Sequence, residues 1–358
     1  MVSDELSRPR VPEVAPRDPQ RRPVYSVVVP VYRNEETLSA VVERLDGLAD
    51  ELDGGLEAVF VVDGSPDASL LLLRRLLSMK RRFSSQLIAL SRNFGSFSAV
   101  RAGLAAAEGE YLAMMAADLQ EPVSLVRDFF RGLARGEHDI AIGVRTARDD
   151  PVRDMLPARV FWWLYRHLVE REIPPGGVDV FGCTRQVADQ LLRLNESHTS
   201  LVGLLYWVGF RRLEVPYERQ PRLIGKSGWG FRRKVRYLLD SIFSFTDLPI
   251  TAIIVLGAIG VTVSTVWSII VMAAWAAGKI SVPGYTPLML ALFFVTSTVL
   301  IALGLVGSYV WRTYENSKGR PSVVSMMHER FDTDDAGDPA SRARDQASAL
   351  GSGSTPAG

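Results

Sequence analysis

Residues 111–122 read YLAMMAADLQEP, and this stretch decides how the chain is expected to fold. Its apolar run is typical of a buried parallel strand, and Asp118, Gln120, Glu121 and Pro122 follow it. Ligands of open α/β sheets bind beyond the carboxyl ends of the strands, where a carboxylate can hold a cation against a phosphate. The alternative is that Asp118 only caps the next helix, because Asp is a favoured N-cap residue.

Short apolar runs alternate with helical patterns on both sides of this stretch. Strands are expected at residues 24–32, 56–63, 86–91, 111–118 and 139–144, and helices at 35–52, 68–79 and 96–107. The first helix should bury one apolar face, which consists of Leu38, Val41, Val42, Leu45 and Leu48. This alternation predicts an α/β fold whose mainly parallel sheet carries helices on both faces.

Every expected strand is followed by polar residues. They are Tyr32 and Asn34, Asp63 and Ser65, Arg92 and Asn93, Asp118 and Gln120, and Arg145. Parallel strands bring such residues to one edge of the sheet, so the pattern predicts a ligand site. The alternative, that polar residues end strands everywhere, explains any single pair but not acidic and basic groups at successive ends. The chain lacks G-x-G-x-x-G after its first strand and lacks G-x-x-x-x-G-K-[ST], which argues against a Rossmann site and a P-loop.

Composition limits the remaining possibilities. The chain has 358 residues, enough for more than one domain, and its net charge of +1 does not point to nucleic acid as a partner. The single cysteine, Cys183, excludes an internal disulfide and a cysteine-rich zinc site. Residues 1–23 are charged and proline-rich without an apolar core, so a disordered arm is expected rather than a signal peptide. A largely disordered tail is expected at residues 314–358.

Two long uncharged segments precede that tail. Residues 248–278 and 280–311 contain no Asp, Glu, Lys or Arg, and each exceeds the roughly 20 apolar residues that span a bilayer. Only Lys279 separates them. A pair of buried soluble helices is the alternative, which this length without charge disfavours. The sequence therefore predicts a transmembrane hairpin at residues 248–313.

Basic residues predict the orientation of this hairpin. Those flanking it are Arg232, Arg233, Lys234 and Arg236 on one side, and Arg312, Lys318 and Arg320 on the other. Positive charge favours the cytoplasmic side, so the domain at 24–225 and both termini are expected in the cytoplasm, at the inner membrane. Residues 226–247 combine an apolar face with the basic cluster, which predicts an amphipathic helix lying on the bilayer surface.

An ordered set of motifs then resembles a known family. The motifs are VVVPVYRNEE, VVDGSPDAS, LSRNFG, MAADLQEP, GVDVFGCTR and GKSGWGFRRKVRYLLDSIFSFTDLP, followed by the hairpin. Together they resemble family-2 glycosyltransferases of the polyprenyl-phosphate sugar transferase type, such as dolichol-phosphate mannose synthase and bactoprenol glucosyltransferase. The resemblance implies a GT-A fold, a nucleotide-sugar donor, Mg²⁺ or Mn²⁺, and inverting transfer to polyprenyl (undecaprenyl) phosphate. Members of this group can be tetrameric, and the sequence leaves the oligomeric state open.

The resemblance also implies roles for individual residues. Binding of the nucleotide sugar would involve Pro30, Tyr32, Asn34, Glu35, Asp63, Arg92, Asn93 and Gln120. Catalysis would involve Asp118 as the metal ligand, Arg145 facing phosphate, and Asp179 near the acceptor. Binding of the lipid phosphate would involve Arg148, Lys226, Arg232 and Arg233, although headgroup binding alone also explains the last three. The family usually reads D-A-D-L-Q, whereas this chain has Ala116 at the first aspartate, which should weaken metal binding.

Two other functions compete with this interpretation. A processive polysaccharide synthase would carry a Q-x-x-R-W motif and more spans, but Gln220 is followed by PRLIG. A non-catalytic, membrane-anchored nucleotide-sugar binder would explain Ala116, but the retained Asp118, Gln120 and Asp179 argue against it. The sequence does not separate uridine from guanosine donors; a UDP-hexose is expected only because the bacterial members of the group suggest it.

Overall fold

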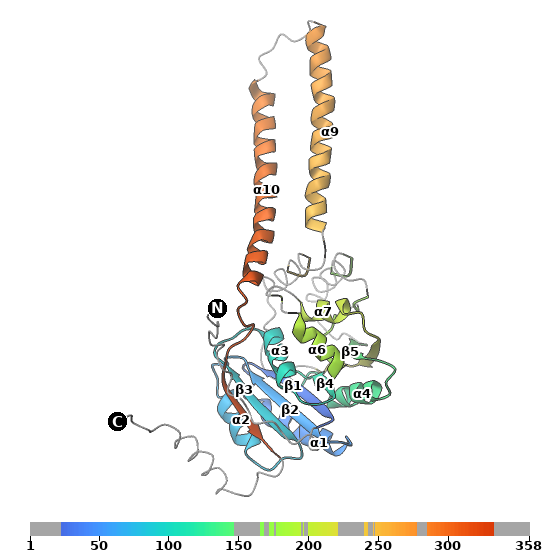
Figure 1. Ribbon diagram of the computed structural model, residues 1–358, viewed down its shortest axis with the longest axis vertical. Coiled ribbons are helices and arrows are strands. Elements are labelled where there is room, and N and C mark those ends of the chain that lie inside the picture. Colours follow the sequence, from blue (N-terminus) through green and yellow to red (C-terminus); the bar gives the residue numbers. More distant parts are fainter. Residues whose placement is uncertain are drawn as a thin grey trace, which may run out of the picture.

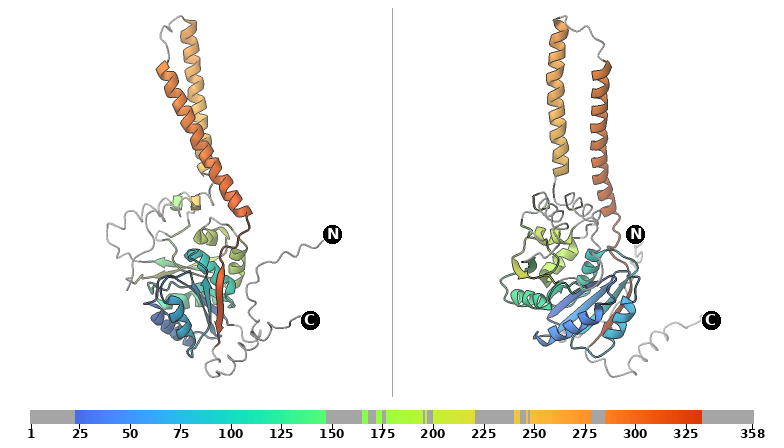
Figure 2. Two further views of the ribbon diagram at one scale, coloured as in Figure 1. Left: turned by 90° about the vertical axis from the view of Figure 1, so that its left-hand side faces the viewer. Right: turned by 180° about the vertical axis from the view of Figure 1, so that it is seen from behind.

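The computed structural model describes residues 23–146, 165–167, 172–174, 177–194, 196, 200–220, 240–242, 246, 248–277 and 285–332. Within them, an α/β body carries two long helices that extend away from it side by side (Figures 1 and 2). The body is built on one eight-stranded sheet with the order β7-β5-β6-β4-β1-β2-β3-β8. This is a GT-A-like arrangement, and the expected α/β class is confirmed.

The sheet is mixed and mostly parallel. Its strands are β1 (Tyr25–Val31), β2 (Leu56–Val62), β3 (Ser84–Leu90), β4 (Tyr111–Met114), β5 (Ile140–Arg145), β6 (Phe181–Thr184), β7 (Arg212–Tyr217) and β8 (Ser325–Phe331). Strand β1 pairs in parallel with β2 and β4, β2 with β3, and β5 with β7. Strand β6 runs antiparallel between β4 and β5, and β8 runs antiparallel to β3. All residues of β2 are buried, as expected for a parallel strand covered on both faces.

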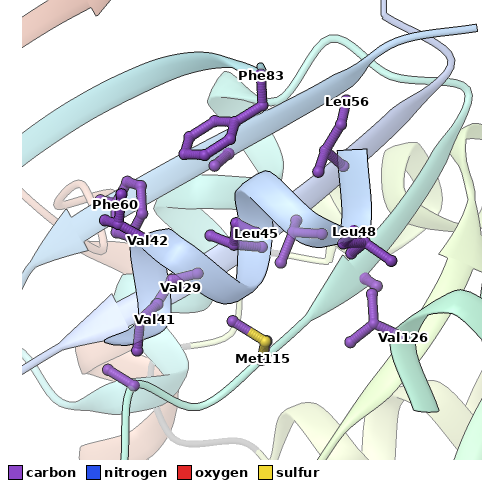
Figure 3. Packing of buried hydrophobic residues seen from close by; sticks show 14 of the residues in the cluster. Val29, Val41, Val42, Leu45, Leu48, Leu56, Phe60, Phe83, Met115 and Val126 are labelled. Carbon is purple, nitrogen blue, oxygen red and sulfur yellow. The ribbon is translucent and has the colours of Figure 1, made fainter. Parts of the chain in front are cut away.

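Helices cover both faces of the sheet, as the sequence predicts. In the body they are α1 (Leu38–Asp50), α2 (Ser69–Leu77), α3 (Ser96–Ala106), α4 (Val123–Ala134), α6 (Arg185–Arg193) and α7 (Leu201–Trp207). Helices α1, α2 and α4 enclose one core cluster, and α3, α6 and α7 enclose the other. Figure 3 shows the first of these, where α1 packs Val41, Val42 and Leu45 toward Val29 and Phe60. The apolar face expected for α1 is confirmed, because all five of its residues are buried.

Strand β4 is shorter than expected. The sequence predicts a strand to residue 118, whereas β4 ends at Met114. The chain then leaves the sheet, and Thr37 in the β1–α1 loop donates its hydroxyl to the Ala117 carbonyl at 2.6 Å. Leu119 turns through the left-handed region at φ 58°. Most of the apolar residues of the loop after Met114 are buried like those of the strand, so the apolar pattern alone did not show where the strand ends.

The C-terminal segment differs from the expectation of a largely disordered tail over residues 314–358. Residues 325–331 form β8, which returns to the sheet edge beside β3 (Figure 1). The strand reads SMMHERF, which does not alternate polar and apolar side chains, and its partner β3 is distant in sequence, so the local pattern gave little signal. Strands β6 and β7 were also not predicted, and both are short.

Two long helices occupy the expected hairpin. Helix α9 spans Leu248–Ala276 and helix α10 spans Tyr285–Ser317. Near the body, Arg312 of α10 donates to the Asp240 carboxylate at 2.7 Å. Among the described residues, no helix meets the criteria of length and hydropathy for a membrane span. Most of the expected amphipathic helix, residues 226–239, lies outside the described residues.

Candidate functional site

The sheet topology brings the expected site residues to one edge. Registers pair Val31 with Val62 and Val62 with Ala89, so the carboxyl ends of β1, β2 and β3 lie together. Strand β4 runs parallel to β1, and β5 pairs with β7 up to Arg145 and Tyr217. Because β6 is antiparallel, its start lies at the same edge, and the start is preceded by Asp179.

Asp63 links two of the loops at this edge. Its side chain is buried, and its carboxylate accepts hydrogen bonds from the backbone N–H groups of Phe94 and Gly95 at 2.7 and 2.9 Å. Gly95 is the N-cap of α3, so the carboxylate lies at the positive end of that helix. Burial raises the pKa of Asp63, although these backbone donors act in the opposite direction. Asn93 donates its side-chain amide to the Asp63 carbonyl at 3.3 Å.

The β1–α1 loop is fastened to the β2–α2 loop by polar contacts. The N–H of Arg33 donates to Ser65 Oγ at 2.8 Å, and the N–H of Glu35 donates to Asp67 Oδ2 at 3.3 Å. Glu35 in turn accepts from the Ala68 N–H at 3.1 Å. Ser65 and Asp67 thus order the loops that hold the expected nucleoside residues. Glu35 has a structural contact here in addition to the binding role that the resemblance implies.

The remaining residues expected to bind the nucleotide sugar surround these loops. Pro30 lies in β1, and Tyr32 just after it is 42% exposed. Asn34 accepts from the Tyr32 N–H at 3.0 Å. The Arg92 guanidinium stacks over the Phe94 ring, 4.1 Å from its centroid. Exposed aromatic and basic groups beside fixed polar loops suit a nucleotide, which offers a planar base and anionic phosphates.

Asp118 is not the cap of the next helix. The N-cap of α4 is Pro122, and Asp118 instead accepts from the Gln120 N–H at 3.3 Å. Leu119, between them, has a positive φ that non-glycine residues rarely adopt. Strained backbone of this kind concentrates at functional sites, where the surrounding structure holds it in place. The structure therefore excludes the alternative that Asp118 only caps the next helix.

Arg145 and Asp179 form an ion pair. The Arg145 guanidinium donates to Asp179 Oδ2, and the Tyr217 hydroxyl donates to the same oxygen at 3.3 Å. Burial, followed by the charge of Asp179, raises the pKa of Tyr217, so its hydroxyl keeps the proton that it donates. The sequence predicted Arg145 and Asp179 as site residues but missed Tyr217, which only the β5–β7 pairing brings to them.

Glu121 is a buried carboxyl group in the same cluster. Its side chain is 4% exposed, and Oε2 has no hydrogen-bond partner among the described residues. Burial raises the pKa of Glu121 to about 7, and the charges of Asp118 and Asp179 act in the same direction. Arg219 and Arg145 oppose this shift. Glu121 therefore lies within the electrostatic reach of Asp118, Asp179 and both arginines.

Gln120 connects this cluster to the segment after β7. Its side chain is buried, and Oε1 accepts from Arg219 Nη2 at 2.6 Å. The backbone N–H of Gln220 donates to the Gln120 carbonyl at 2.9 Å. Arg219 and Glu121 are further residues that sequence reasoning missed. Glu121 lies within the motif at residues 111–122, whereas no sequence motif pointed to Arg219, which the fold brings into contact with Gln120.

The donor set fits a weakly held divalent cation. The described residues contain no group of three or more His, Cys, Asp or Glu side chains that could hold a metal. Mg²⁺ is commonly bound through one or two carboxylates, with waters and substrate phosphates completing its shell. Asp118 lies beyond the end of β4, and Glu121 Oε2, which has no hydrogen-bond partner among the described residues, adds a second carboxyl oxygen in the same cluster. The residues present therefore fit a cation shared with a phosphate ligand and not a closed protein cage.

Four of the expected site residues lie outside the described residues. They are Arg148, Lys226, Arg232 and Arg233, which the resemblance assigns to the lipid phosphate. Among the described residues, one side of the site joins Asp118, Gln120, Arg145 and Asp179. The other side holds the loops after β1 and β2, which carry residues expected to bind the nucleoside, and the Thr37 contact to Ala117 links the two sides.

The described residues form an α/β body with polar loops at one sheet edge. The model of glycosyl transferase family 2 matches residues 26–192, and the chain belongs to this family. It is 32% identical over 297 residues to an uncharacterized glycosyltransferase of Synechocystis sp., covering 83% of this chain and 92% of that protein.

Two further relatives extend the comparison. The chain is 25% identical over 300 residues to the undecaprenyl-phosphate 4-deoxy-4-formamido-L-arabinose transferase of Edwardsiella ictaluri, covering 83% of this chain and 91% of that protein. Among solved structures, glucosyl-3-phosphoglycerate synthase from Mycobacterium tuberculosis in complex with Mn²⁺, UDP and phosphoglyceric acid aligns at a TM-score of 0.43 and 16% identity. That alignment covers 63% of this chain and 80% of the synthase chain.

Proposed function

We propose that this glycosyltransferase moves a hexose from a nucleotide sugar, a UDP-hexose by expectation, to polyprenyl phosphate with inversion at the anomeric carbon. One observation carries the proposal: Asp118 and Gln120 of the loop after β4, Arg145 of β5 and Asp179 before β6 come from three segments and converge at one sheet edge of a family-2 chain. The acceptor class is supported by the relative that is named for undecaprenyl phosphate and covers most of the chain.

The leaving group of this reaction is a nucleoside diphosphate. A divalent cation, Mg²⁺ or Mn²⁺, would be held by Asp118 and would supply Lewis-acid stabilisation of the charge that develops there. Arg145 adds a fixed positive charge on the same side, which is electrostatic stabilisation by a preorganised group. Gln120, anchored by Arg219, fixes the position of the loop that carries Asp118. Catalysis of this kind depends on placement more than on proton transfer.

The attacking atom would be an oxygen of the acceptor phosphate. A phosphate monoester has a second pKa near 6, so it is mostly dianionic at neutral pH and needs little help from a base. Asp179 is therefore assigned to positioning first and to proton acceptance second. Its contacts with Arg145 and Tyr217 hold the carboxylate in one orientation, which suits that role.

The acceptor must reach the site from a lipid bilayer. We place the hairpin at 248–313 in the inner membrane, with the catalytic body and both termini in the cytoplasm. The uncharged lengths of 248–278 and 280–311 and the basic flanks support this placement. Residues 226–247 would lie on the bilayer surface, with Lys226, Arg232 and Arg233 toward phosphate groups. A tetramer stays a prediction of the resemblance.

A transfer assay separates this function from a non-catalytic binder. Membranes containing the chain are incubated with labelled UDP- and GDP-sugars and undecaprenyl phosphate, with Mg²⁺, with Mn²⁺ or with neither. We expect lipid-extractable label with one donor class and a divalent cation. Binding of donors without any extractable label would support the binder instead. Full transfer by Asp118→Ala would contradict the metal assignment, while leaving the transferase assignment intact.

A further inference from the structure

We infer that Arg219 binds a phosphate group of one of the two reactants. The inference rests on the proposed function and adds a residue to the same site. Arg219 lies two residues after β7, in a segment that no motif of the sequence singled out. It is the last arginine before residues 221–239, which lie outside the described residues.

One nitrogen of the Arg219 guanidinium already donates a hydrogen bond within the protein. Its Nη2 donates to Gln120 Oε1 at 2.6 Å, and the Gln220 N–H donates to the Gln120 carbonyl at 2.9 Å. The Gln120 side-chain amide points back to the Gln220 carbonyl at 3.4 Å. These contacts fix the plane of the guanidinium beside the motif that carries Asp118. A planar cation held in this way is prepared to bind a second group.

Among the residues that the structure describes, no hydrogen bond joins the Arg219 guanidinium to a carboxylate. Arg219 Nε is buried and has no hydrogen-bond partner among the described residues. A buried donor of this kind costs free energy unless a partner arrives. Arg145 has the same property: one edge donates to Asp179, and its Nε is buried without a partner among the described residues.

Arg219 and Arg145 therefore each keep a buried Nε donor without a hydrogen-bond partner among the described residues, while another nitrogen of the same guanidinium contacts the protein. Both act on the Glu121 carboxyl, which places them in one cluster with Asp118 and Asp179. Arginine is well suited to phosphate because its parallel N–H groups match two phosphate oxygens. The ligand chemistry is thus a phosphate, which the donor supplies as a diphosphate and the acceptor as a lipid monoester.

Equilibrium binding to the full-length chain in detergent tests the inference. Calorimetry compares the wild type with Arg219→Gln and Arg219→Lys, using UDP and GDP with Mn²⁺, uridine and guanosine, and dodecyl phosphate. A lost charge-assisted hydrogen bond should weaken phosphate-ligand binding by about 10- to 100-fold in Arg219→Gln. Binding of the nucleosides should not change, and Arg219→Lys should retain part of the affinity. Weakened UDP or GDP binding assigns the donor diphosphate, and weakened dodecyl phosphate binding assigns the acceptor.

Arg211→Gln is the matched control. Arg211 lies at the other end of β7, where its exposed guanidinium donates to Asp139 at 2.9 Å. This variant should bind every ligand as the wild type does. Wild-type affinity of Arg219→Gln for UDP, GDP and dodecyl phosphate would overturn the inference and leave the proposed function standing. So would an equal loss of nucleoside and nucleotide binding, which indicates a structural role. Failure of the wild type to bind any phosphate ligand would instead contradict the proposed function itself.

Discussion

Gly64, in the loop after β2, packs against the backbone of Arg92 and Asn93 in the loop after β3. It has φ 57°, and a Cβ atom there would lie 2.3 Å from the Arg92 carbonyl carbon. Gly64→Ala should therefore lower the free energy of unfolding by about 1–3 kcal/mol and weaken nucleotide binding, because the Asp63 and Arg92 loops must separate. Thermal unfolding and UDP or GDP calorimetry measure both effects.

Gly47→Ala is the control for this prediction. Gly47 lies in α1, and a Cβ atom there meets nothing within 4 Å. Alanine should leave binding unchanged and stabilise the helix by up to about 1 kcal/mol. Equal stability losses in both variants would contradict the argument from close approach.

Glu121 should make stability depend on pH. Its pKa is raised to about 7 by burial, from an ordinary value of 4.5. The folded state therefore binds the proton more tightly than the unfolded state, and stability is lost as pH rises from about 4.5 through 7. The shift corresponds to a contribution on the order of 3 kcal/mol. Glu121→Gln has no titrating group at this position and should not lose stability in this way. The free energy of unfolding of Glu121→Gln minus that of the wild type should therefore be more positive at pH 8 than at pH 5.

Thermal unfolding of the wild type and Glu121→Gln at these two pH values measures the effect. A difference between the two proteins that is the same at pH 5 and pH 8 would show that Glu121 does not titrate in this range. Asp63→Asn is a suitable comparison, because the Asp63 carboxyl is also buried but has two backbone donors.

At the scale of residues, sequence reasoning found the groups that end strands. Asp118, Gln120 and Arg145 were predicted because a parallel sheet must bring strand ends together. Tyr217 and Arg219 were missed, because Pro216 interrupts the alternating pattern of β7 and the pairing of β7 with β5 joins residues about 70 positions apart. Glu121 lies in the motif at residues 111–122 but was not predicted as a site residue, because its burial depends on packing that the motif does not reveal.

At the scale of elements, β8 is the main addition to the expected fold. His328 Nε2 lies 2.6 Å from Gln86 Oε1, and Gln86 donates to the fully buried Glu57 at 2.7 Å. Ion pairs of Arg330 with Glu108 and of Glu329 with Arg74 flank this contact. The strand therefore continues a polar network that crosses β2, β3 and β8.

His328→Leu should destabilise the body by about 1–3 kcal/mol, because the amide oxygen of the buried Gln86 loses this partner. Thermal unfolding measures the loss. Met326→Leu is the control, because Met326 lies on the same strand with 65% of its surface exposed. Equal unfolding midpoints for the two variants would mean that the network adds no stability.

Elements that depend on local pattern were predicted well. Strands β1, β2 and β3 and helices α1, α2 and α3 each lie within a few residues of their expected bounds. Strands β6, β7 and β8 pair with partners that are distant in sequence. Strand β6 has only four residues, β7 contains Pro216, and β8 does not alternate polar and apolar side chains, so none of them was predicted. The length of β4 was overestimated, because a buried loop and a buried strand share the same apolar composition.

At the scale of the whole molecule, the two long helices are joined to the α/β body that carries the candidate site. Helix α10 leads through residues 318–324 to β8, so the chain after the hairpin returns to the sheet (Figure 2). Both ends of the hairpin are thus attached to the body, with Arg312 and Asp240 in contact near its base.

The most direct test is acceptor-dependent transfer by the purified full-length chain in liposomes. The vesicles contain or lack polyprenyl phosphate, and labelled UDP- or GDP-sugar is added with Mg²⁺ or Mn²⁺. The account predicts label in the organic extract only when polyprenyl phosphate and one donor class are both present, and a strong reduction in Asp118→Ala. No extractable label with any donor, or equal label without polyprenyl phosphate, would contradict it.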